Sequence, residues 1–471
     1  MLRRFLRKNI LIVSLLVAFV VIESFYLAIQ TEIGWDDAVY IGMGKYIFSN
    51  GNAGLWEPIR PLTLPIILGF LWKIGLNPLI AGKIVVIVFS LAVILLTYIL
   101  AKKIFDEKTA AAASILITFS GLMIQNGHQI LVEVLTVLFL LLGFYFYLEK
   151  RHFACGMFFG FAFLTKFPAA LFLIALFSFE AFYMFFKKEE THYFKKLPYI
   201  LLGFAIVTLP YFLFNYIAYS DALFPIKSAN DIIGKVVGCN VLHKQPPHYY
   251  FLLMLQDNFL NLFFVAGAFF AFRSKEKKYQ MQILFYLALF FAYFMGLSCK
   301  TERYPILALP FIAMISGYGM MQIFREADKR KMKIILAIIL LISALFSVNY
   351  IMLTINRQLP NPEFYSYIYN KEANGSILTT NPIVTLYTDK ELGLIYYPLY
   401  NSTRNEDYSI YIAKNKKNIS YIFVNTEDIP CHPNDLGCPE RTTQLIKLLK
   451  SNFKIAYYKK TNNSEYFIFS Q

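Results

Sequence analysis

Long apolar runs separated by short polar segments dominate the chain up to about residue 353. Runs of near-spanning length are found at 9–29, 80–101, 109–125, 129–148, 152–166, 168–187, 197–218, 257–272, 280–298, 303–324 and 333–353. A helix needs about 20 mainly apolar residues to cross a bilayer, so these runs predict about eleven transmembrane helices. Several runs are short, and we expect tilting, local thinning of the bilayer or incomplete crossing there.

The segment 61–75 is also apolar, but two prolines stand near its start and it is too short to span comfortably. Counting it as a crossing would invert the side of every later basic loop. We therefore predict a helix that lies in the outer interface, with Trp72 and Lys73 at the level of the lipid headgroups.

From about residue 354 the apolar runs give way to Asn, Tyr, Lys, Asp and Thr. Short β-rich stretches are found at 376–380, 420–425, 454–458 and 465–469, and 440–449 has a helical pattern. The sequence predicts two domains: a helical transmembrane domain over 1–353, with an outer-face loop at 30–78, and a small α/β domain over 354–471.

Composition and charge agree with an integral membrane protein. The chain has 57% hydrophobic and only 16% charged residues, with a net charge of +15. The cations cluster in short loops at 102–108, 150–151, 187–196, 273–278 and 325–333, which disfavours nucleic-acid binding and follows the positive-inside rule. With Arg3, Arg4, Arg7 and Lys8 before an uncleaved first span, we expect a multi-pass cell-membrane protein with a cytoplasmic N-terminus and an extracytoplasmic C-terminal domain.

Cysteine spacing agrees with that placement. Cys431 and Cys438 bracket a short loop that a disulfide could close in an oxidising compartment. Two free thiols, or half of a metal site with His432, are the alternatives. We expect Cys155, Cys239 and Cys299 to be unpaired.

Ionisable residues gather at the ends of the runs that this topology places outside. They are Asp36, Asp37, Glu57, Arg60, His128, Glu133, Lys166, Lys300, Glu302 and Arg303. Any one of them could be a snorkelling side chain or part of a solvated loop. Their shared face favours a functional site, because ionisable groups close to hydrocarbon are costly unless they are paired or used.

Acidic and cationic groups together suit a lipid-linked phosphosugar. Arg or Lys can bind its phosphate at the headgroup plane, and Arg offers a planar fork for phosphate oxygens. A carboxylate can take the proton from an acceptor hydroxyl, while the cations stabilise the charge on the departing phosphate.

Four segments in order resemble the GT-C membrane glycosyltransferases of the protein O-mannosyltransferase and aminoarabinose-transferase superfamily. Residues 35–40 (Trp-Asp-Asp-Ala-Val-Tyr) follow the first span, where the family has Asp-Glu followed by Ala and Tyr. Residues 60–65 (Arg-Pro-Leu-Thr-Leu-Pro) are similar to its Arg-Pro-Pro-Leu segment, and 163–168 (Phe-Leu-Thr-Lys-Phe-Pro) to its Leu-Thr-Lys-Gly-Pro. Residues 302–305 (Glu-Arg-Tyr-Pro) precede a late span. The resemblance covers about residues 1–350.

The resemblance implies a polyprenyl- or dolichyl-phosphate sugar donor and Asp36 as the catalytic base. Asp37 stands where the family usually has Glu, which puts a supporting or metal-binding role for it in doubt. Phe167 replaces a glycine after Lys166, so the following turn is less flexible. Some members bind a divalent metal and others need none, so the metal requirement stays open. Protein, lipid and glycan acceptors are all compatible with the sequence.

Two other classes of function compete with this reading. A secondary transporter or lipid flippase typically shows paired repeats and ionisable residues near the middle of the membrane. We find no repeat, and the charges gather at one face. A structural or receptor-like protein would leave the placement of Asp36, Asp37 and Lys166 unexplained.

Overall fold

The computed structural model describes residues 9–29, 33–187, 196–232, 243–274, 278–354, 359, 361–369, 371–395, 410–429, 436–462 and 464–471. Packing divides the chain into two compact units, which we describe separately. The membrane unit comprises Met1–Gln30, Lys83–Ala222 and Lys244–Arg357. The sheet unit comprises Thr31–Gly82, Leu223–His243 and Gln358–Gln471.

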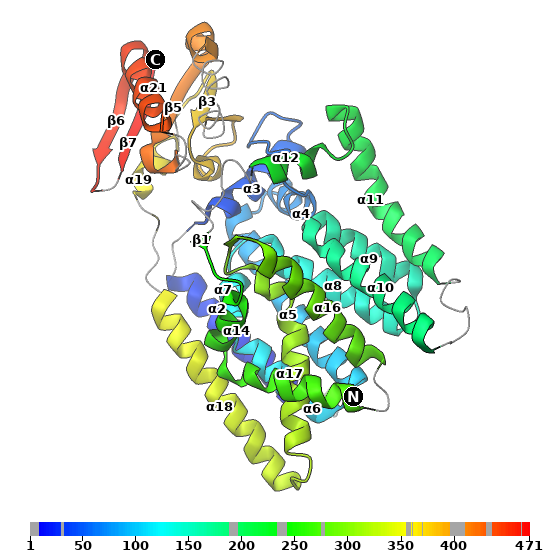
Figure 1. Cartoon of the computed structure of the whole chain (residues 1–471). Helices are drawn as coiled ribbons and strands as arrows, with labels where there is room; N and C mark the ends of the chain where they lie inside the picture. The colour runs from blue at the N-terminus through cyan, green and yellow to red at the C-terminus, as the bar shows by residue number, and fades with distance from the viewer. Residues whose placement is uncertain are drawn as a thin grey trace. The chain divides into compact units, whose positions relative to one another are not determined.

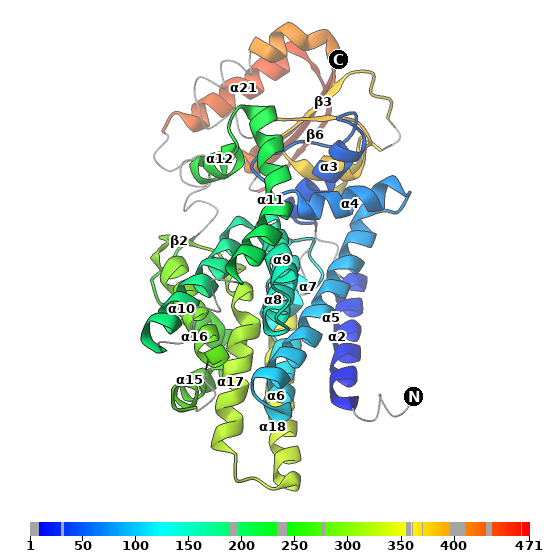
Figure 2. The same ribbon diagram turned by 90° about the vertical axis from the view of Figure 1, so that its right-hand side faces the viewer.

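The membrane unit is a bundle of apolar helices (Figures 1 and 2). In chain order they are α2 (Ile10–Ile29), α5 (Pro78–Ile104, which starts in the sheet unit), α6 (Glu107–Thr118), α7 (Gly121–Gly127), α8 (Val132–Leu148), α9 (His152–Thr165), α10 (Ala170–Lys187), α11 (Leu197–Tyr219), α14 (Tyr249–Asp257), α15 (Phe264–Arg273), α16 (Lys278–Gly296), α17 (Leu309–Ile323) and α18 (Lys329–Thr354). Short 3-10 turns are η1 (Phe167–Ala169), η4 (Phe259–Phe263) and η5 (Tyr304–Leu307), and β1 (His243–Lys244) and β2 (Cys299–Lys300) form a two-stranded sheet.

Every apolar run predicted to span coincides with one of these helices or with a helix pair. Among the described residues, six helices are individually long and apolar enough to cross a membrane. The α6–α7 pair is apolar enough only when the two helices are taken together, and it is bent by 59° at the break between them. Helices α8, α9 and α17 and the η4–α15 pair are shorter apolar segments. The predicted polytopic helical fold is confirmed, although α8 and α17 are shorter than the predicted runs 129–148 and 303–324.

Glycines allow α9 and α11 to pack closely. A Cβ added at Gly156 would lie 1.9 Å from the carbonyl oxygen of Ile200, and one at Gly203 would lie 2.1 Å from that of Phe153. Both distances are impossible for a real side chain, so the two backbones touch only because glycine stands at each contact. Small residues at helix interfaces are how membrane helices gain van der Waals contact without a hydrophobic driving force.

The sheet unit is built on five strands in the order β4-β3-β5-β7-β6. They are β3 (Ser376–Thr379), β4 (Leu392–Leu394), β5 (Ile419–Asn425), β6 (Lys454–Lys460) and β7 (Glu465–Ser470). β4, β3 and β5 are parallel, while β7 runs antiparallel to both β5 and β6. Four strands match predicted stretches. The sequence missed β4 because it has only three residues, one of them Gly393.

Helices from the C-terminal segment and from earlier parts of the chain complete the unit. They are α3 (Trp35–Phe48), α4 (Thr63–Lys73), α12 (Phe224–Ile232), α19 (Pro362–Ser366) and α21 (Cys438–Asn452), with 3-10 turns η6 (Pro382–Leu386), η8 (Lys416–Asn418) and η9 (Thr426–Asp428). Alternation along β5 sends Phe423 into one core, and Ile422 and Val424 into a second core that contains Leu445 and Leu449 of α21. The predicted C-terminal α/β character is confirmed.

The grouping of the 30–78 loop differs from the predicted domain division. The sequence assigned this loop to the transmembrane domain, but residues 31–82 pack with 358–471. Ala38, Val39 and Met43 of α3, with Leu55, share one apolar core with side chains of the C-terminal segment such as Phe364 and Phe423. This packing connects positions more than 300 residues apart, and such a pairing leaves no trace in local periodicity.

The cysteines are only partly as expected. Cys155 is buried and free. Cys299 is disulfide-bonded, which corrects the expectation that it is unpaired; sequence alone does not determine disulfide connectivity. The predicted Cys431–Cys438 disulfide lies outside the described residues, because Cys431 and the side chain of Cys438 are not among them.

Candidate functional site

In the sheet unit, α3 begins with the sequence Trp-Asp-Asp, and its two acids have different environments. Asp37 is 2% exposed, and its Oδ2 accepts a hydrogen bond from the backbone N–H of Gly34 at 3.1 Å. A carboxylate in the first turn satisfies an otherwise open N–H group and interacts favourably with the helix dipole. Asp37 therefore stabilises the start of α3, while Asp36, the residue before it, is half-buried and pairs with another side chain.

Asp36 forms an ion pair with Arg60, with 2.7 Å between Oδ1 and Nη1. The Nε of Arg60 donates to Oε2 of Glu57 at 3.0 Å, and its guanidinium lies 5.2 Å from the ring centre of Tyr40. The side chains of Asp36 and Arg60 are 18% and 19% exposed, whereas that of Glu57 is 1% exposed. A buried carboxylate and an aromatic ring thus hold the arginine beside a carboxylate that solvent and a ligand can reach.

In the membrane unit, Lys166 joins segments that are far apart in sequence. Its Nζ lies 2.6 Å from Oε1 of Glu133, in the first turn of α8, and 4.9 Å from the ring centre of Tyr304. Lys166 follows the last residue of α9, and Tyr304 opens η5, which packs on α8. Arg303 directly precedes Tyr304 and is half-buried. The structure therefore brings Glu133, Lys166 and the 303–304 segment together.

The other predicted residues lie outside this group. His128 is buried with its Nδ1 3.1 Å from Oε2 of Glu23, and its ring stacks on Tyr26 at 4.5 Å. This contact connects α2 to the end of α7, so the structure gives His128 a packing role. Glu23 was missed by the sequence reasoning, although a lone acid inside the apolar run 9–29 is itself a signal.

Lys300 and Glu302 differ in burial, although they are only two residues apart. Lys300 is 2% exposed, and its Nζ donates to the backbone carbonyl of Gln245 at 3.1 Å and to that of Leu297. The ammonium therefore connects the residue after β1 to the segment that precedes β2. Glu302 is exposed. Tyr40 contacts Arg60 and Tyr304 contacts Lys166, and the sequence marks these tyrosines only as members of the 35–40 and 302–305 motifs.

Neither the side chains around Asp36 nor those around Glu133 form a metal-binding cluster within the part of the chain that the structure describes. No set of three or more His, Cys, Asp or Glu side chains there has the arrangement to hold a metal ion.

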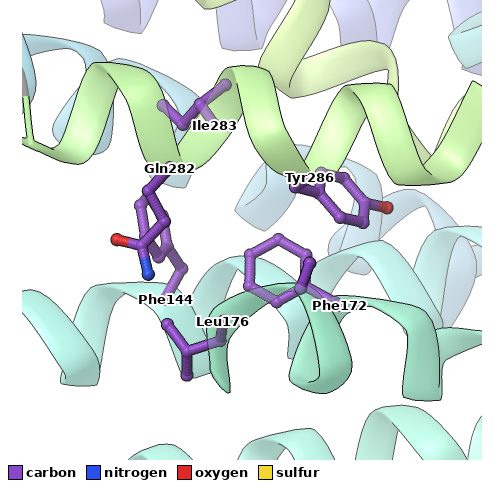
Figure 3. A pocket seen from close by; sticks show the side chains of 7 residues that line it. Phe144, Phe172, Leu176, Gln282, Ile283 and Tyr286 are labelled. Carbon is purple, nitrogen blue, oxygen red and sulfur yellow. The ribbon is translucent and has the colours of Figure 1, made fainter. Parts of the chain in front are cut away.

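The membrane unit also contains a small cavity whose lining includes none of the ionisable residues described above. Side chains of α8, α10 and α16 line it, and Figure 3 shows Gln282 of α16 directed toward Phe144 and Leu176. Tyr286 and Phe172 close another side, and none of the predicted site residues is among its lining. Its mainly aromatic and aliphatic lining carries no acid–base chemistry.

Comparisons with known proteins agree with this architecture. Residues 59–214 match the family model of dolichyl-phosphate-mannose-protein mannosyltransferases. ArnT from Cupriavidus metallidurans bound to undecaprenyl phosphate superimposes with a TM-score of 0.69 at 12% identity, over 98% of each chain. The chain has the GT-C fold.

Two further structures share the GT-C fold. ArnT from C. metallidurans in the apo state gives a TM-score of 0.63 at 11% identity, over 97% of each chain. The Archaeoglobus fulgidus oligosaccharyltransferase, tethered to an acceptor peptide containing the NVT sequon, gives 0.61 at 12% identity. That match covers 99% of this chain and 75% of the other. A comparison with curated proteins finds no match.

The Glu133–Lys166 pair gives a prediction about stability in this GT-C domain. Both side chains are largely buried, so Lys166→Met leaves the carboxylate of Glu133 without its lysine, which costs more than removing both charges. We expect the unfolding temperature of Lys166→Met in detergent to lie below that of the double variant Lys166→Met/Glu133→Gln. Lys108→Met, at an exposed lysine, is the control and should leave it unchanged. A double variant no more stable than Lys166→Met would contradict the pairing.

Proposed function

We propose that this protein transfers a sugar from a polyprenyl-phosphate donor to an acceptor on the extracytoplasmic face, with inversion at the anomeric carbon. The observation that carries the proposal is the Asp36–Arg60 pair, a partly exposed carboxylate held beside a fixed guanidinium. A glycosyl transfer from phosphate needs a proton acceptor and cations for phosphate oxygens. The GT-C fold supports the same class of reaction.

In the proposed step, a carboxylate oxygen of Asp36 takes the proton from the acceptor hydroxyl. The acceptor oxygen forms a bond to the anomeric carbon as the bond from that carbon to the phosphate oxygen breaks. The phosphate leaves with the electron pair, through a transition state of oxocarbenium character. One displacement at one carbon inverts its configuration, whereas retention would need a covalent glycosyl–enzyme intermediate.

The type of donor is supported by the relatives. The C. metallidurans ArnT structure contains undecaprenyl phosphate, and the matched family model is described by a dolichyl-phosphate sugar. The A. fulgidus enzyme carries an acceptor peptide, which supports a protein acceptor among the protein, lipid and glycan alternatives. We assign neither the sugar nor the acceptor more narrowly.

We further propose that the N-terminus is cytoplasmic and that the C-terminal segment is extracytoplasmic. The alternating basic loops support this orientation, and the disulfide at Cys299 suits an oxidising compartment. A cysteine introduced at exposed Ser451 should react with a membrane-impermeant reagent in intact cells, and one introduced at exposed Lys108 should not. The reverse labelling pattern would reject the orientation and the location of the reaction.

Replacement of the base should nearly abolish turnover. Asp36→Asn keeps the shape of the side chain but cannot accept the proton, and loss of a general base costs on the order of 100- to 10,000-fold in rate. Carrier consumption measured by mass spectrometry should fall by that factor while carrier binding persists. Glu372→Gln removes a carboxylate from an exposed position and should be as active as the parent.

Two results would overturn the assignment of Asp36. Turnover within about threefold of the parent in folded Asp36→Asn would place the base elsewhere, because such a loss is far below the usual general-base contribution. Glu133 would then be the next candidate. A product with retained anomeric configuration would reject the single displacement, even if Asp36 proved essential.

We propose that Arg303, helped by Lys166, binds the carrier phosphate. Arg303→Lys keeps the charge but removes the planar fork that meets two phosphate oxygens. We expect the KM for the carrier to rise about 10-fold, because the variant loses one charge-assisted hydrogen bond to the phosphate. Arg325→Lys, at an exposed position just after α17, is the control. An unaltered KM for Arg303→Lys would remove Arg303 from the phosphate site.

A further inference from the structure

The helix that carries Asp36 has its C-terminal half anchored to the C-terminal segment. Lys45 lies in the last turn of α3 and is 4% exposed. Its Nζ donates to the carbonyl oxygen of Thr385 at 2.8 Å and to that of Thr388 at 3.0 Å, and lies 2.9 Å from Oδ1 of Asp389. All three acceptors belong to a stretch of five residues, so one side chain connects α3 to one point of the sheet unit.

Because the Lys45 ammonium is buried, it needs hydrogen-bond acceptors from the protein in place of water. Loss of water around the Lys45 ammonium lowers its pKa, and the carboxylate of Asp389 opposes that shift. A buried ammonium is tolerated when its hydrogen bonds are satisfied, and here two carbonyls and a carboxylate satisfy them. Removing the ammonium would leave the buried carbonyl oxygen of Thr385 without this donor, and an unsatisfied buried polar group destabilises the fold.

Backbone contacts fix the same region from a second side. Gly54 has φ of +83°, and its N–H donates to the carbonyl of Lys390 while its own carbonyl accepts from the N–H of Leu392 at 2.7 Å. Residues 54 and 391 thereby form a parallel bridge, which ties the chain after α3 to the start of β4. A Cβ at Gly54 would lie 2.1 Å from the carbonyl oxygen of Gly42, so α3 itself touches this bridge.

Helix α4 completes the support. A Cβ at Gly44 would lie 2.6 Å from the carbonyl oxygen of Pro65, and one at Gly69 would lie 2.4 Å from that of Gly44. The indole Nε1 of Trp72 then donates to Oδ1 of Asp389 at 3.2 Å, which is the oxygen that also pairs with Lys45. Asp389 therefore connects α3 and α4 to the segment that follows η6.

We infer that residues 385–391 position the helix that carries the catalytic carboxylate, and that Lys45 is a positioning residue for glycosyl transfer through Asp36. The inference rests on the proposed function of Asp36 as the base. Lys45 is nine residues from Asp36, about 13 Å along a helix at 1.5 Å per residue. A rigid helix transmits a displacement at one end to the other. The C-terminal segment on this account contributes to catalysis by positioning α3.

The test compares Lys45→Met with Lys447→Met in the protein in lipid. Both variants replace a lysine by a side chain of similar length, but Lys447 lies at an exposed position of α21, outside residues 385–391. For Lys45→Met we expect kcat to fall about 10- to 100-fold, as for a misplaced catalytic group, with the carrier KM changed less than about twofold. Lys447→Met should match the parent, and Lys45→Arg, which keeps charge and donors, should recover part of kcat.

Hydrogen exchange tests whether Lys45 positions α3, independently of whether the proposed reaction takes place. In Lys45→Met the amides of residues 35–48 should exchange faster, while those of α17 keep the parental rate. This readout stands even if no donor is turned over by any variant, in which case the proposed function fails and the positioning contact survives. If Lys45→Met does not fold, Asp389→Asn, which spares both carbonyl contacts, should show a smaller loss of kcat with faster exchange at 35–48. Parental kcat and parental exchange in the folded variant would overturn the inference.

Discussion

The structure of the sheet unit depends on one buried ammonium group. Lys45 brings its charge out of water and meets the carbonyl oxygens of Thr385 and Thr388 together with the carboxylate of Asp389. Because a buried charge is costly unless it is hydrogen-bonded, this contact specifies one arrangement of α3 against the C-terminal segment. Residues 38–55, which follow the first span, therefore share a core with strands of the C-terminal segment.

This arrangement separates structural charges from those available for chemistry. Asp37 caps a helix, Glu57 holds an arginine, Lys300 binds backbone carbonyls and His128 meets Glu23. Asp36, Arg60 and Lys166 keep part of their surface exposed. Burial and satisfied hydrogen bonds distinguish the charges with a structural role from those that stay partly exposed, and the positions of these residues in the sequence do not show that distinction.

The spans could be predicted because a bilayer forces backbone groups to pair within each helix, so hydropathy alone marks them. The strands β3, β5, β6 and β7 were visible from local composition, as was α21. The packing of Leu55 and α3 with Phe364 was not, because it joins distant segments. The disulfide at Cys299 and the three-residue strand β4 were also missed, since neither connectivity nor a very short strand has a local signature. The resemblance found Asp36 and Arg60, but only the structure shows that they are paired.

The central claim is that this GT-C protein releases a polyprenyl phosphate as it transfers a sugar. The most direct measurement is to incubate the purified protein in lipid with a panel of polyprenyl-phosphate sugars and acceptors, and to follow both products by mass spectrometry. The account predicts that at least one donor is consumed, with equal amounts of free polyprenyl phosphate and glycosylated acceptor. Folded protein that consumes no donor in the panel, or that moves a lipid across the bilayer without breaking its glycosyl bond, would contradict it.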